Sequence, residues 1–268
     1  RDAATGYPMR TALSVLAMSI GVAAVVVLTA LGDGARRYVV GQFSSLGTNL
    51  VIVLPGRSGT GGFNPANAIT TTPRDLTVDD AAALLRAPGV RRAAPLAVGT
   101  SEISVAGRLR EVMVAGTTAS YFPIRSFELG QGSALPDEDW GRGSSVAVIG
   151  AKIREEMFGN APAIGQLVRV GDRRLRVVGV LKPVGQGLGM NTDELVIVPV
   201  ALAQALFNSN TLFRILVEAK SREAIPEARE QALDILKQRH RGEEDVTVIT
   251  QDAVLATFDK LLGALTLA

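Results

Sequence analysis

Residues able to perform acid–base or nucleophilic chemistry are scarce in this sequence of 268 residues. It contains one histidine, His240, and no cysteine. His240 lies in the basic run 237–241, near the end of a predicted helix, where a cation complements the negative end of the helix dipole. The motif Gly-x-Ser-x-Gly, which marks a nucleophilic serine, is absent. We therefore expect His240 to be an exposed, non-catalytic residue, and we expect the chain not to be an enzyme.

Two acidic clusters and two glycine-rich runs are the other candidates for ligand binding. The clusters 137–139 and 243–245 lack the spaced oxygen ligands of a calcium loop, so we expect both to be solvated. The run 56–62 lacks the lysine of a phosphate loop. The run 185–189 lacks a third glycine at the spacing of a dinucleotide loop and the helix that follows such a loop. The sequence therefore predicts no catalytic residue, no metal site and no cofactor in this chain.

The charge balance gives no sign of a nucleic-acid partner. Lysine and arginine number 28 against 26 acidic residues, a net charge of +2, whereas nucleic-acid-binding surfaces gather an excess of basic side chains. The lack of cysteine excludes disulfides and thiolate metal sites. Hydrophobic residues make up 47% of the chain although aromatic residues supply only 4%. This composition suits a membrane segment attached to a globular part.

One segment near the start of the sequence is apolar on every side. Residues Thr11 to Leu31 include no Asp, Glu, Lys or Arg, and as a helix they extend about 31 Å, close to the thickness of a bilayer core. We therefore predict a transmembrane helix over 11–32. The alternatives are a cleaved signal peptide, whose apolar core is shorter, and a buried helix of a soluble protein. Ala17 and Gly21 form a small-xxx-small pair that lets another membrane helix approach closely.

Both ends of the sequence suggest a helical stalk next to a membrane span. The polar segment 33–47 is predicted to continue the first helix as a stalk. From Asp252 the sequence again has helical character and loses its charge after Lys260. We therefore expect a second stalk at 251–260 and the start of a second transmembrane helix at 261–268, with the given sequence ending as a fragment inside that helix.

The segments between these ends predict an α+β fold. Residues 48–118 and 211–250 each carry a β-α-β order, and two such units pair into a split βαβ domain with helices on one sheet face. Residues 119–210 differ, because they consist mostly of short strands, and we expect them to form an inserted, mostly-β subdomain. The predicted strands are 50–55, 90–105, 110–115, 145–149, 195–198, 213–219 and 246–249, with a turn at Ala106-Gly107 after the second strand and a 167–181 hairpin that turns at Gly171-Asp172. One predicted helix opens with Thr77-Val-Asp-Asp80 and has an apolar stripe of Ala81, Leu84 and Leu85. The other predicted helices cover 151–158, 201–207 and 225–236, and the apolar stripe of the last comprises Ile225, Ala228, Ala232, Ile235 and Leu236.

Six phrases, spread in order over nearly the whole chain, carry a family resemblance. They are RTALSVLAMSIGVAAVVVLTALGDG, LGTNLVIVLPG, VMVAGTTASYF, SSVAVIGAKIREEMFG, IGQLVRVGDRRLRVVGVL and LKQRHRGEEDVTV. Together they resemble the permeases of MacB-type ABC transporters, which have a MacB-like periplasmic core domain and belong to the FtsX-like permeases. The sequence departs from the complete pattern, since three of the four membrane helices are missing or cut and the ATPase is absent.

The resemblance implies a fold, a location and partners. It implies a porter-like domain with an inserted Sabre-like subdomain in the periplasm or extracytoplasmic space, between two helices of the bacterial inner membrane. The expected division is an N-terminal segment 1–10, a membrane helix 11–32, a stalk 33–47, porter-like parts 48–118 and 211–250, a Sabre-like part 119–210, a second stalk 251–260 and the start of a second span 261–268.

The resemblance also implies how such a chain works. Permeases of this family act as dimers, so a homodimer or a pairing with a paralogous permease is expected, in contact with membrane lipid. ATP and Mg²⁺ would bind to a cytoplasmic ABC ATPase, whose closure would be transmitted through the membrane for export. In a Gram-negative cell a periplasmic adaptor and an outer-membrane channel would complete the pump. Alternatives are a lipoprotein-releasing or cell-wall-hydrolase-regulating permease, a secreted binding module with a cleaved leader, or a membrane-tethered hydrolase.

One loop is a candidate contact with a partner. It places apolar side chains among glycines and comprises Gly185, Gln186, Gly187, Leu188, Gly189, Met190 and Asn191. We expect this loop to become ordered against another protein, the alternative being a plain solvent loop. The glycine-rich segment 56–72 is expected to be a connecting loop.

Overall fold

The computed structural model describes residues 8–44, 49–56, 74–184, 191–250 and 252–253. The chain divides into two units, one made of residues 1–42 and 258–268 and the other of residues 43–257. The described part of the first unit is a single helix, and the second unit holds a mixed sheet with its helices. The predicted loop 56–72, the second stalk and the second membrane span lie almost wholly outside the described residues.

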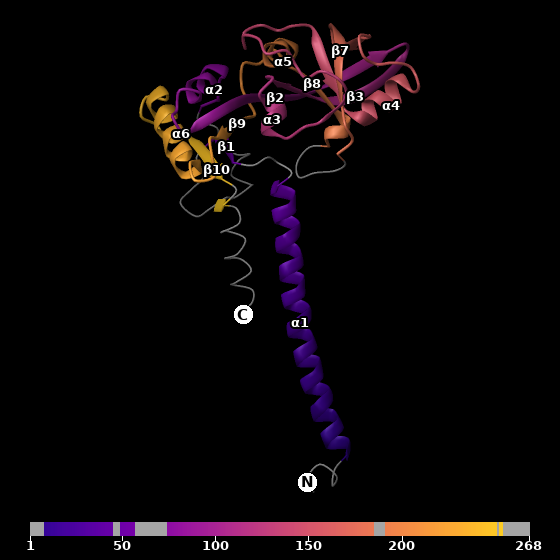
Figure 1. Ribbon diagram of the computed structural model, residues 1–268, viewed down its shortest axis with the longest axis vertical. Helices are drawn as coiled ribbons and strands as arrows, with labels where there is room; N and C mark the ends of the chain where they lie inside the picture. Colours follow the sequence, from indigo (N-terminus) through magenta and orange to yellow (C-terminus); the bar gives the residue numbers. More distant parts are fainter. Residues whose placement is uncertain (1–7, 45–48, 57–73, 185–190, 251, 254–268) are drawn as a thin grey trace. The chain divides into compact units, whose positions relative to one another are not determined.

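The described residues of the first unit all belong to helix α1, Pro8–Ser44 (Figure 1). Its segment Thr11–Ala35 has a mean hydropathy of 2.4, and no residue in the most apolar stretch of this segment is buried. The hydroxyl groups of Ser19 and Thr29 donate to the carbonyls of Val15 and Val25 four residues earlier, at 2.8 and 2.9 Å. These polar groups are therefore satisfied inside the helix, as a lipid environment requires. The predicted continuation of the helix beyond residue 32 is confirmed as far as Ser44.

Four strands of the second unit form the predicted split βαβ arrangement. The strands are β1 (Leu50–Pro55), β2 (Val90–Val105), β9 (Arg214–Ala219) and β10 (Val246–Thr250). They lie in the order β10-β1-β9-β2, and each strand is antiparallel to its neighbours. The two β-α-β units thus interleave, because the strands of each unit are separated by a strand of the other.

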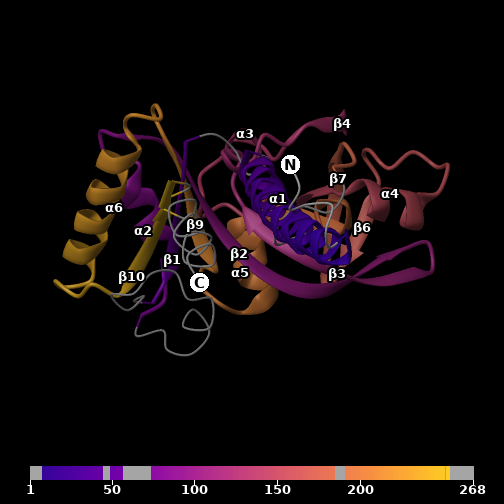
Figure 2. The ribbon, with the colours of Figure 1, turned by 90° about the horizontal axis from the view of Figure 1, so that it is seen from below.

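Helices α2 (Val78–Leu84) and α6 (Ile225–Arg239) lie together on one face of these strands (Figures 1 and 2). The predicted apolar stripe of α6 is confirmed, and its fully buried members are Ile225, Ala228, Ala232 and Leu236. Helix α2 opens with the predicted capping box, in which the Thr77 hydroxyl accepts from the amide of Asp80 at 3.3 Å. Placing Leu85 on the buried stripe was wrong: it is the residue that ends α2, and 44% of its surface is exposed.

Strand β2 is shared between the two halves of the sheet. Its first part pairs with β9 as far as Leu96, and from Ala97 onward it pairs with β3 (Arg108–Thr117). The two strands are joined by the predicted turn at Ala106 and Gly107, where φ is +47° and +80°. Positive φ at both positions is the hallmark of a type I′ hairpin turn, for which glycine is well suited.

The remaining strands continue the sheet from β3. They are β8 (Leu195–Pro199), β5 (Val146–Ile149), β7 (Arg173–Leu181), β4 (Leu129–Gly132) and β6 (Leu167–Val170). Strand β3 pairs in parallel with β8, which leads through β5 and β7 to the edge strand β4. Strand β6 pairs with β7 in the predicted hairpin and also with β2. This half of the sheet therefore curls back on itself.

Four short helical segments complete the second unit. They are α3 (Tyr121–Ile124), α4 (Ala151–Phe158), the 3-10 turn η1 (Thr192–Glu194) and α5 (Val200–Phe207). Helix α5 packs against β2 and β3 at two glycines. A Cβ added to Gly99 would lie 2.5 Å from the ring of Phe207, and one added to Gly116 would lie 2.1 Å from the Cβ of Ala203. Only glycine leaves room for α5 at these positions.

The sheet buries apolar residues on both faces. One cluster joins α2, α6, α4 and α5 to the sheet and includes Val53, Leu84, Ile103 and Leu236. A second cluster on the opposite face surrounds α3 and includes Tyr121 and Leu216.

The elements α3, β4 and η1 were not predicted from the sequence. The α+β fold is confirmed, while the division at 118/119 and 210/211 stays a prediction, since β3 pairs directly with strands of both predicted parts.

Candidate functional site

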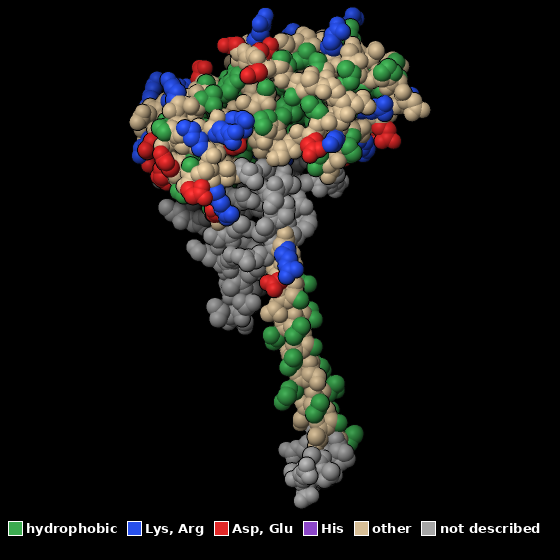
Figure 3. Space-filling model, viewed as in Figure 1, with side chains coloured by type: hydrophobic (Ala, Val, Ile, Leu, Met, Phe, Trp, Pro, Cys, Tyr) green, Lys and Arg blue, Asp and Glu red, His purple; other side chains and the backbone are tan. Residues whose placement is uncertain are grey.

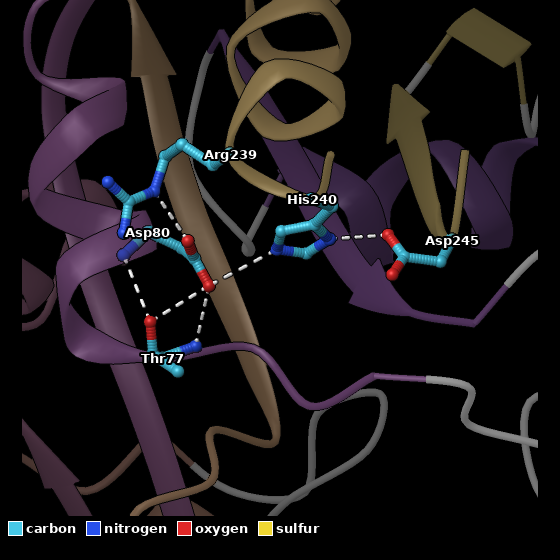
Figure 4. A network of polar contacts seen from close by, with 5 residues as sticks. All are labelled: Thr77, Asp80, Arg239, His240 and Asp245. Atoms are coloured by element: carbon cyan, nitrogen blue, oxygen red, sulfur yellow. Dashed lines mark hydrogen bonds and ion pairs between the residues drawn. The ribbon is translucent and has the colours of Figure 1, made fainter. Parts of the chain in front are cut away.

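A buried polar network joins the start of α2 to the end of α6 and the start of β10 (Figure 4). At its centre the imidazole of His240 lies between two carboxylates. Its Nδ1 contacts Asp245 Oδ1, and its Nε2 lies 3.4 Å from Asp80 Oδ2. The Nε of Arg239 donates to Asp80 Oδ1 at 2.6 Å. Two basic and two acidic side chains thus meet, and one of them, Asp80, lies about 160 residues before the others in sequence.

Asp80 is the group on which most of these contacts converge. Besides Arg239 and His240, its carboxylate accepts from the backbone amide of Thr77 at 3.0 Å and from the Thr77 hydroxyl at 2.9 Å. Burial raises the pKa of Asp80, but the hydrogen bonds from Arg239, Thr77 and His240 together outweigh it, so the pKa lies below its ordinary value of 3.8. The carboxylate is therefore held in its ionised form.

The backbone at the end of α6 places His240 between the two carboxylates. His240 is the residue that ends α6, and its amide donates to the carbonyl of Leu236 at 2.8 Å. The chain then turns sharply, with Arg241 at a φ of +59° and the Gly242 amide bonded to the carbonyl of Lys237 at 2.7 Å. This helix-ending motif directs the chain towards β10 and brings Asp245 beside the ring.

The chemistry available to this network is limited. His240 can donate to both carboxylates only when both ring nitrogens carry a proton, and the cluster then holds two positive and two negative charges. The only hydroxyl in it, that of Thr77, is already committed to Asp80. In the described part of the chain, no group of three or more acidic or histidine residues could hold a metal. The network therefore acts as a clamp between α2, α6 and β10.

The structure corrects two expectations here. His240 was expected to be exposed, but only 3% of its surface is accessible, because α2 covers it with Asp80. Asp245 was expected to be solvated with its acidic neighbours, and it is also buried, with 3% accessible. The sequence signal that could have indicated the contact is the short His240-to-Asp245 spacing across a glycine turn. The position of Asp80 gave no comparable signal, since it lies 160 residues away from His240.

The other predicted site residues do not come together at one place. Ala17 and Gly21 lie one turn apart on the exposed surface of α1, and a Cβ at Gly21 would meet nothing within 4 Å. Their role in helix packing stays a prediction. In the candidate partner loop, residues 185–190 lie outside the described residues. Asn191 is described, and its side chain accepts from the amide of Asp193 at 3.2 Å at the start of η1.

The acidic cluster 137–139 has an ordinary structural role in part. Glu138 accepts from the hydroxyl of Ser144 at 2.5 Å, and Asp139 accepts from the amide of Gly141 at 2.8 Å.

An open depression of about 560 Å³ lies between β4, α4 and the end of β7, and its charged lining residues are Arg154, Glu155 and Lys182. This lining mixes both signs of charge, so the depression has no distinct chemical character.

The largest exposed apolar surface among the described residues belongs to α1. Large side chains along it, such as Leu13, Ile20 and Val26, are each about three-fifths exposed, at 63%, 61% and 59%. On the face that Figure 3 shows, acidic and basic side chains are visible on this helix towards its carboxyl-terminal end, and the sequence has Asp33 and Arg37 in that part. So wide an apolar surface is typical of a helix whose surroundings are lipid or protein.

Comparison with known proteins identifies the family of the chain. Residues 11–235 match the model of the MacB-like periplasmic core domain. The chain belongs to the MacB-like periplasmic core domain family. The family match includes both the apolar part of α1 and most of the mixed sheet, so the predicted MacB-type resemblance is confirmed.

Curated relatives of this family are similar over most of the chain. A protein of Bdellovibrio bacteriovorus named macrolide export ATP-binding/permease protein MacB is 30% identical over 235 residues, covering 87% of this chain and 36% of that protein. The pyoverdine export ATP-binding/permease protein PvdT of Pseudomonas entomophila is 32% identical over 250 residues, covering 92% of this chain and 36% of that protein. The chain thus spans little more than a third of the length of these relatives.

Solved structures of two transporter domains share the fold. The periplasmic region of MacB from Actinobacillus actinomycetemcomitans superposes with a TM-score of 0.68 at 18% identity, covering 83% of this chain and 98% of that one. The extracellular domain of the transporter YknZ from Gram-positive bacteria gives a TM-score of 0.61 at 22% identity, covering 75% of this chain and 100% of that one. The MacB-like core domain therefore has the architecture of these extracytoplasmic domains.

Proposed function

We propose that this chain is the first membrane helix and the extracytoplasmic core domain of a MacB-type ABC exporter permease. In this proposal α1 spans the inner membrane of a bacterium, and the mixed sheet lies in the periplasm or extracytoplasmic space. The chain is non-catalytic. ATP and Mg²⁺ bind to an ABC ATPase, either fused or separate, and ATP-driven closure of a dimer is transmitted through the membrane to the core domain.

The observation that supports this proposal is the joining of two physical elements inside one family match. The match begins at residue 11, at the start of the charge-free run, and extends through the sheet to residue 235. An apolar, unburied helix needs a lipid or protein environment, whereas the sheet buries its own apolar residues on both faces. Relatives that are similar over most of the chain are named for export of macrolides and of pyoverdine. These cargoes differ chemically, so the proposal extends to export and not to one substrate.

The proposal also assigns partners. The chain pairs with a second permease, either an identical copy or a paralogue, and Ala17 and Gly21 on α1 allow a neighbouring membrane helix to approach closely. Membrane lipid surrounds the rest of α1. In a Gram-negative cell a periplasmic adaptor and an outer-membrane channel complete the pump, and the loop 185–191 is the candidate contact with such a partner.

The topology can be tested with introduced cysteines, because this sequence has none of its own. In a Gram-negative host expressing the 268-residue chain, Asn210→Cys lies in the exposed connection between α5 and β9. We expect a membrane-impermeant maleimide to label it once the outer membrane is permeabilised. Thr5→Cys, on the other side of α1 in sequence, should be labelled only after the inner membrane is disrupted. Equal labelling of both positions, or release of the chain by alkaline carbonate, would contradict a membrane span.

The coupling to ATP needs the complete transporter with its ATPase, reconstituted in nanodiscs. Spin labels on Asn210→Cys report the separation of two copies of the core domain. We expect the distance distribution to change between the nucleotide-free and the vanadate-trapped states, and to stay unchanged in a matched transporter whose ATPase cannot hydrolyse ATP. An unchanged distribution in the active transporter would disprove the transmission of movement while leaving the membrane topology intact.

A further inference from the structure

Two arginines on the α3 face of the sheet have no acidic partner. Arg125 ends the single turn of α3 and is only 8% exposed, and Arg214 begins β9 and is partly buried. Within the described part of the chain neither guanidinium forms an ion pair or a side-chain hydrogen bond, and the Nε of each is buried without an acceptor. The hydroxyl of Tyr121, a residue with 0% exposure, is buried without a partner as well.

These three groups belong to one place in the fold. Helix α3 packs against β2 and β9. Side chains alternate along β9, so Arg214 projects from the same face as Leu216, which shares a core cluster with Tyr121. The charges of both arginines also reach Tyr121: burial raises the pKa of the Tyr121 hydroxyl, while Arg125 and Arg214 lower it. Burial lowers the pKa of Arg214, and the charge of Arg125 adds to that effect.

The backbone and the neighbouring rings hold Arg125 in place. Its amide donates to the carbonyl of Tyr121 at 2.9 Å, and the amide of Phe127 donates to the carbonyl of Phe122 at 2.9 Å. Ser126, with a φ of +52°, provides the left-handed residue that this helix-ending turn needs. The Arg125 guanidinium lies 5.5 Å from the centroid of the Phe127 ring, which itself meets the ring of Tyr121 edge-on at 5.5 Å. The donors are therefore preorganised.

The Nε–H groups of Arg125 and Arg214 and the Tyr121 hydroxyl oppose folding, because each of these three donors has lost its water without gaining a partner. A group with several acceptor oxygens and a negative charge would satisfy them all. Carboxylates and phosphates accept two parallel hydrogen bonds from a guanidinium. Phe213, which is 52% exposed and whose ring centroid lies 5.1 Å from the Arg214 guanidinium, offers apolar surface beside these donors.

We propose that Arg125, Arg214 and Tyr121 form a binding site for the carboxylate or phosphate group of a small organic anion. The two arginines supply charge and parallel N–H donors, and the Tyr121 hydroxyl supplies a third donor. Phe213 packs against the apolar body of the same ligand. This site does not depend on the proposed export function, since it requires only the folded core domain.

The test uses the 268-residue chain in an uncharged maltoside detergent, with inorganic phosphate and benzoate as separate probes. The measurement is the ¹⁵N NMR shift of the Nε–H groups of Arg125 and Arg214. We expect saturable shifts with at least one probe, and the preferred probe decides between a phosphate and a carboxylate ligand. Arg125→Gln and Arg214→Gln should each weaken binding by about tenfold or more, because each removes a charge-assisted hydrogen bond. The matched control is Arg174→Gln, an exposed arginine on β7, which should bind unchanged.

Tyr121→Phe separates ligand binding from structure, because it removes the hydroxyl and keeps the buried ring. We expect binding to weaken by about threefold, with the fold retained in the NMR spectrum. Should Arg125→Gln fail to fold, Arg214→Gln and Tyr121→Phe test the same site. The proposal is overturned by the absence of a saturable shift with either probe, by equal weakening in Arg174→Gln, or by a response to acidic peptides alone.

Discussion

The core domain contains two clusters of partly or fully buried charged side chains, and they differ in whether the basic side chains have acidic partners. Around Asp80, the basic side chains of Arg239 and His240 meet two carboxylates, and most donors have an acceptor. Around Tyr121, Arg125 and Arg214 lie together without any acidic partner among the described residues. Burial is common to both, so burial alone does not mark a functional site. The Asp80 network contains both signs of charge and is interpreted as a clamp. The cluster around Tyr121 has no acidic member among the described residues and is interpreted as a candidate binding site.

Removing the central acid of the balanced cluster should have the largest effect. We expect Asp80→Asn to lower the free energy of unfolding by about 3–5 kcal/mol, because it removes the buried carboxylate that the buried His240 and the more exposed Arg239 share. Urea denaturation followed by circular dichroism measures the change. The matched control is Asp79→Asn, an exposed acid on the same turn of α2, which should change stability by less than about 0.5 kcal/mol. Equal losses in the two variants would show that the network is not a clamp.

Removing the histidine should have a smaller effect. His240→Gln keeps a polar side chain but leaves Asp245 without its buried donor, so we expect a loss of about 2 kcal/mol in the same assay. Combined with Asp80→Asn, the loss should be less than the sum of the two single losses, because both changes break one network. Strict additivity in this double-mutant cycle would mean that Asp80 and His240 act independently.

The balanced cluster should also lose stability in acid. The pKa of Asp80 is lowered in the folded chain, so its contribution to stability is present above 3.8 and is lost as pH falls below that value through the lowered pKa. We expect Asp80→Asn to remove this component, which amounts to at most about 1.4 kcal/mol per pH unit. Urea midpoints measured between pH 5 and pH 2 check this, and parallel pH profiles for the two proteins would contradict it.

The unbalanced cluster should respond with the opposite sign. Arg214→Met removes a partly buried charge that has no partner and keeps most of the side-chain volume, so we expect stability to stay level or to rise by up to about 1 kcal/mol. Arg239→Met, which breaks the pair with Asp80, should lower stability. Urea denaturation at pH 7 compares the two. A loss in Arg214→Met as large as that in Arg239→Met would remove the distinction between the clusters.

Local sequence signals predicted most of the fold. The capping box at Thr77, the turns at Ala106-Gly107 and Gly171-Asp172, and the apolar spacing of α6 are each carried by neighbouring residues, and the structure has all of them. Helix α3 was missed because a four-residue turn with Pro123 inside it has no periodicity to recognise.

The two charged clusters could not be predicted in the same way. Each depends on segments far apart in the chain, such as α2 with the end of α6, or α3 with β9, so no local pattern announces it. His240 was judged by its basic neighbours in sequence, whereas α2 and the start of β10 decide its environment. The helix-packing pair Ala17 and Gly21 and the loop 185–191 stay predictions.

The length of β2 has a mechanical consequence. It is 16 residues long, roughly 50 Å when extended, and the same backbone is hydrogen-bonded first to β9 and then to β3. Within the described residues, therefore, the two halves of the sheet are joined by one continuous strand, β2. A torque applied to β1 or β10 would be transmitted through β2 to β6 and β7. The core domain should therefore tilt as one body rather than bend at its middle.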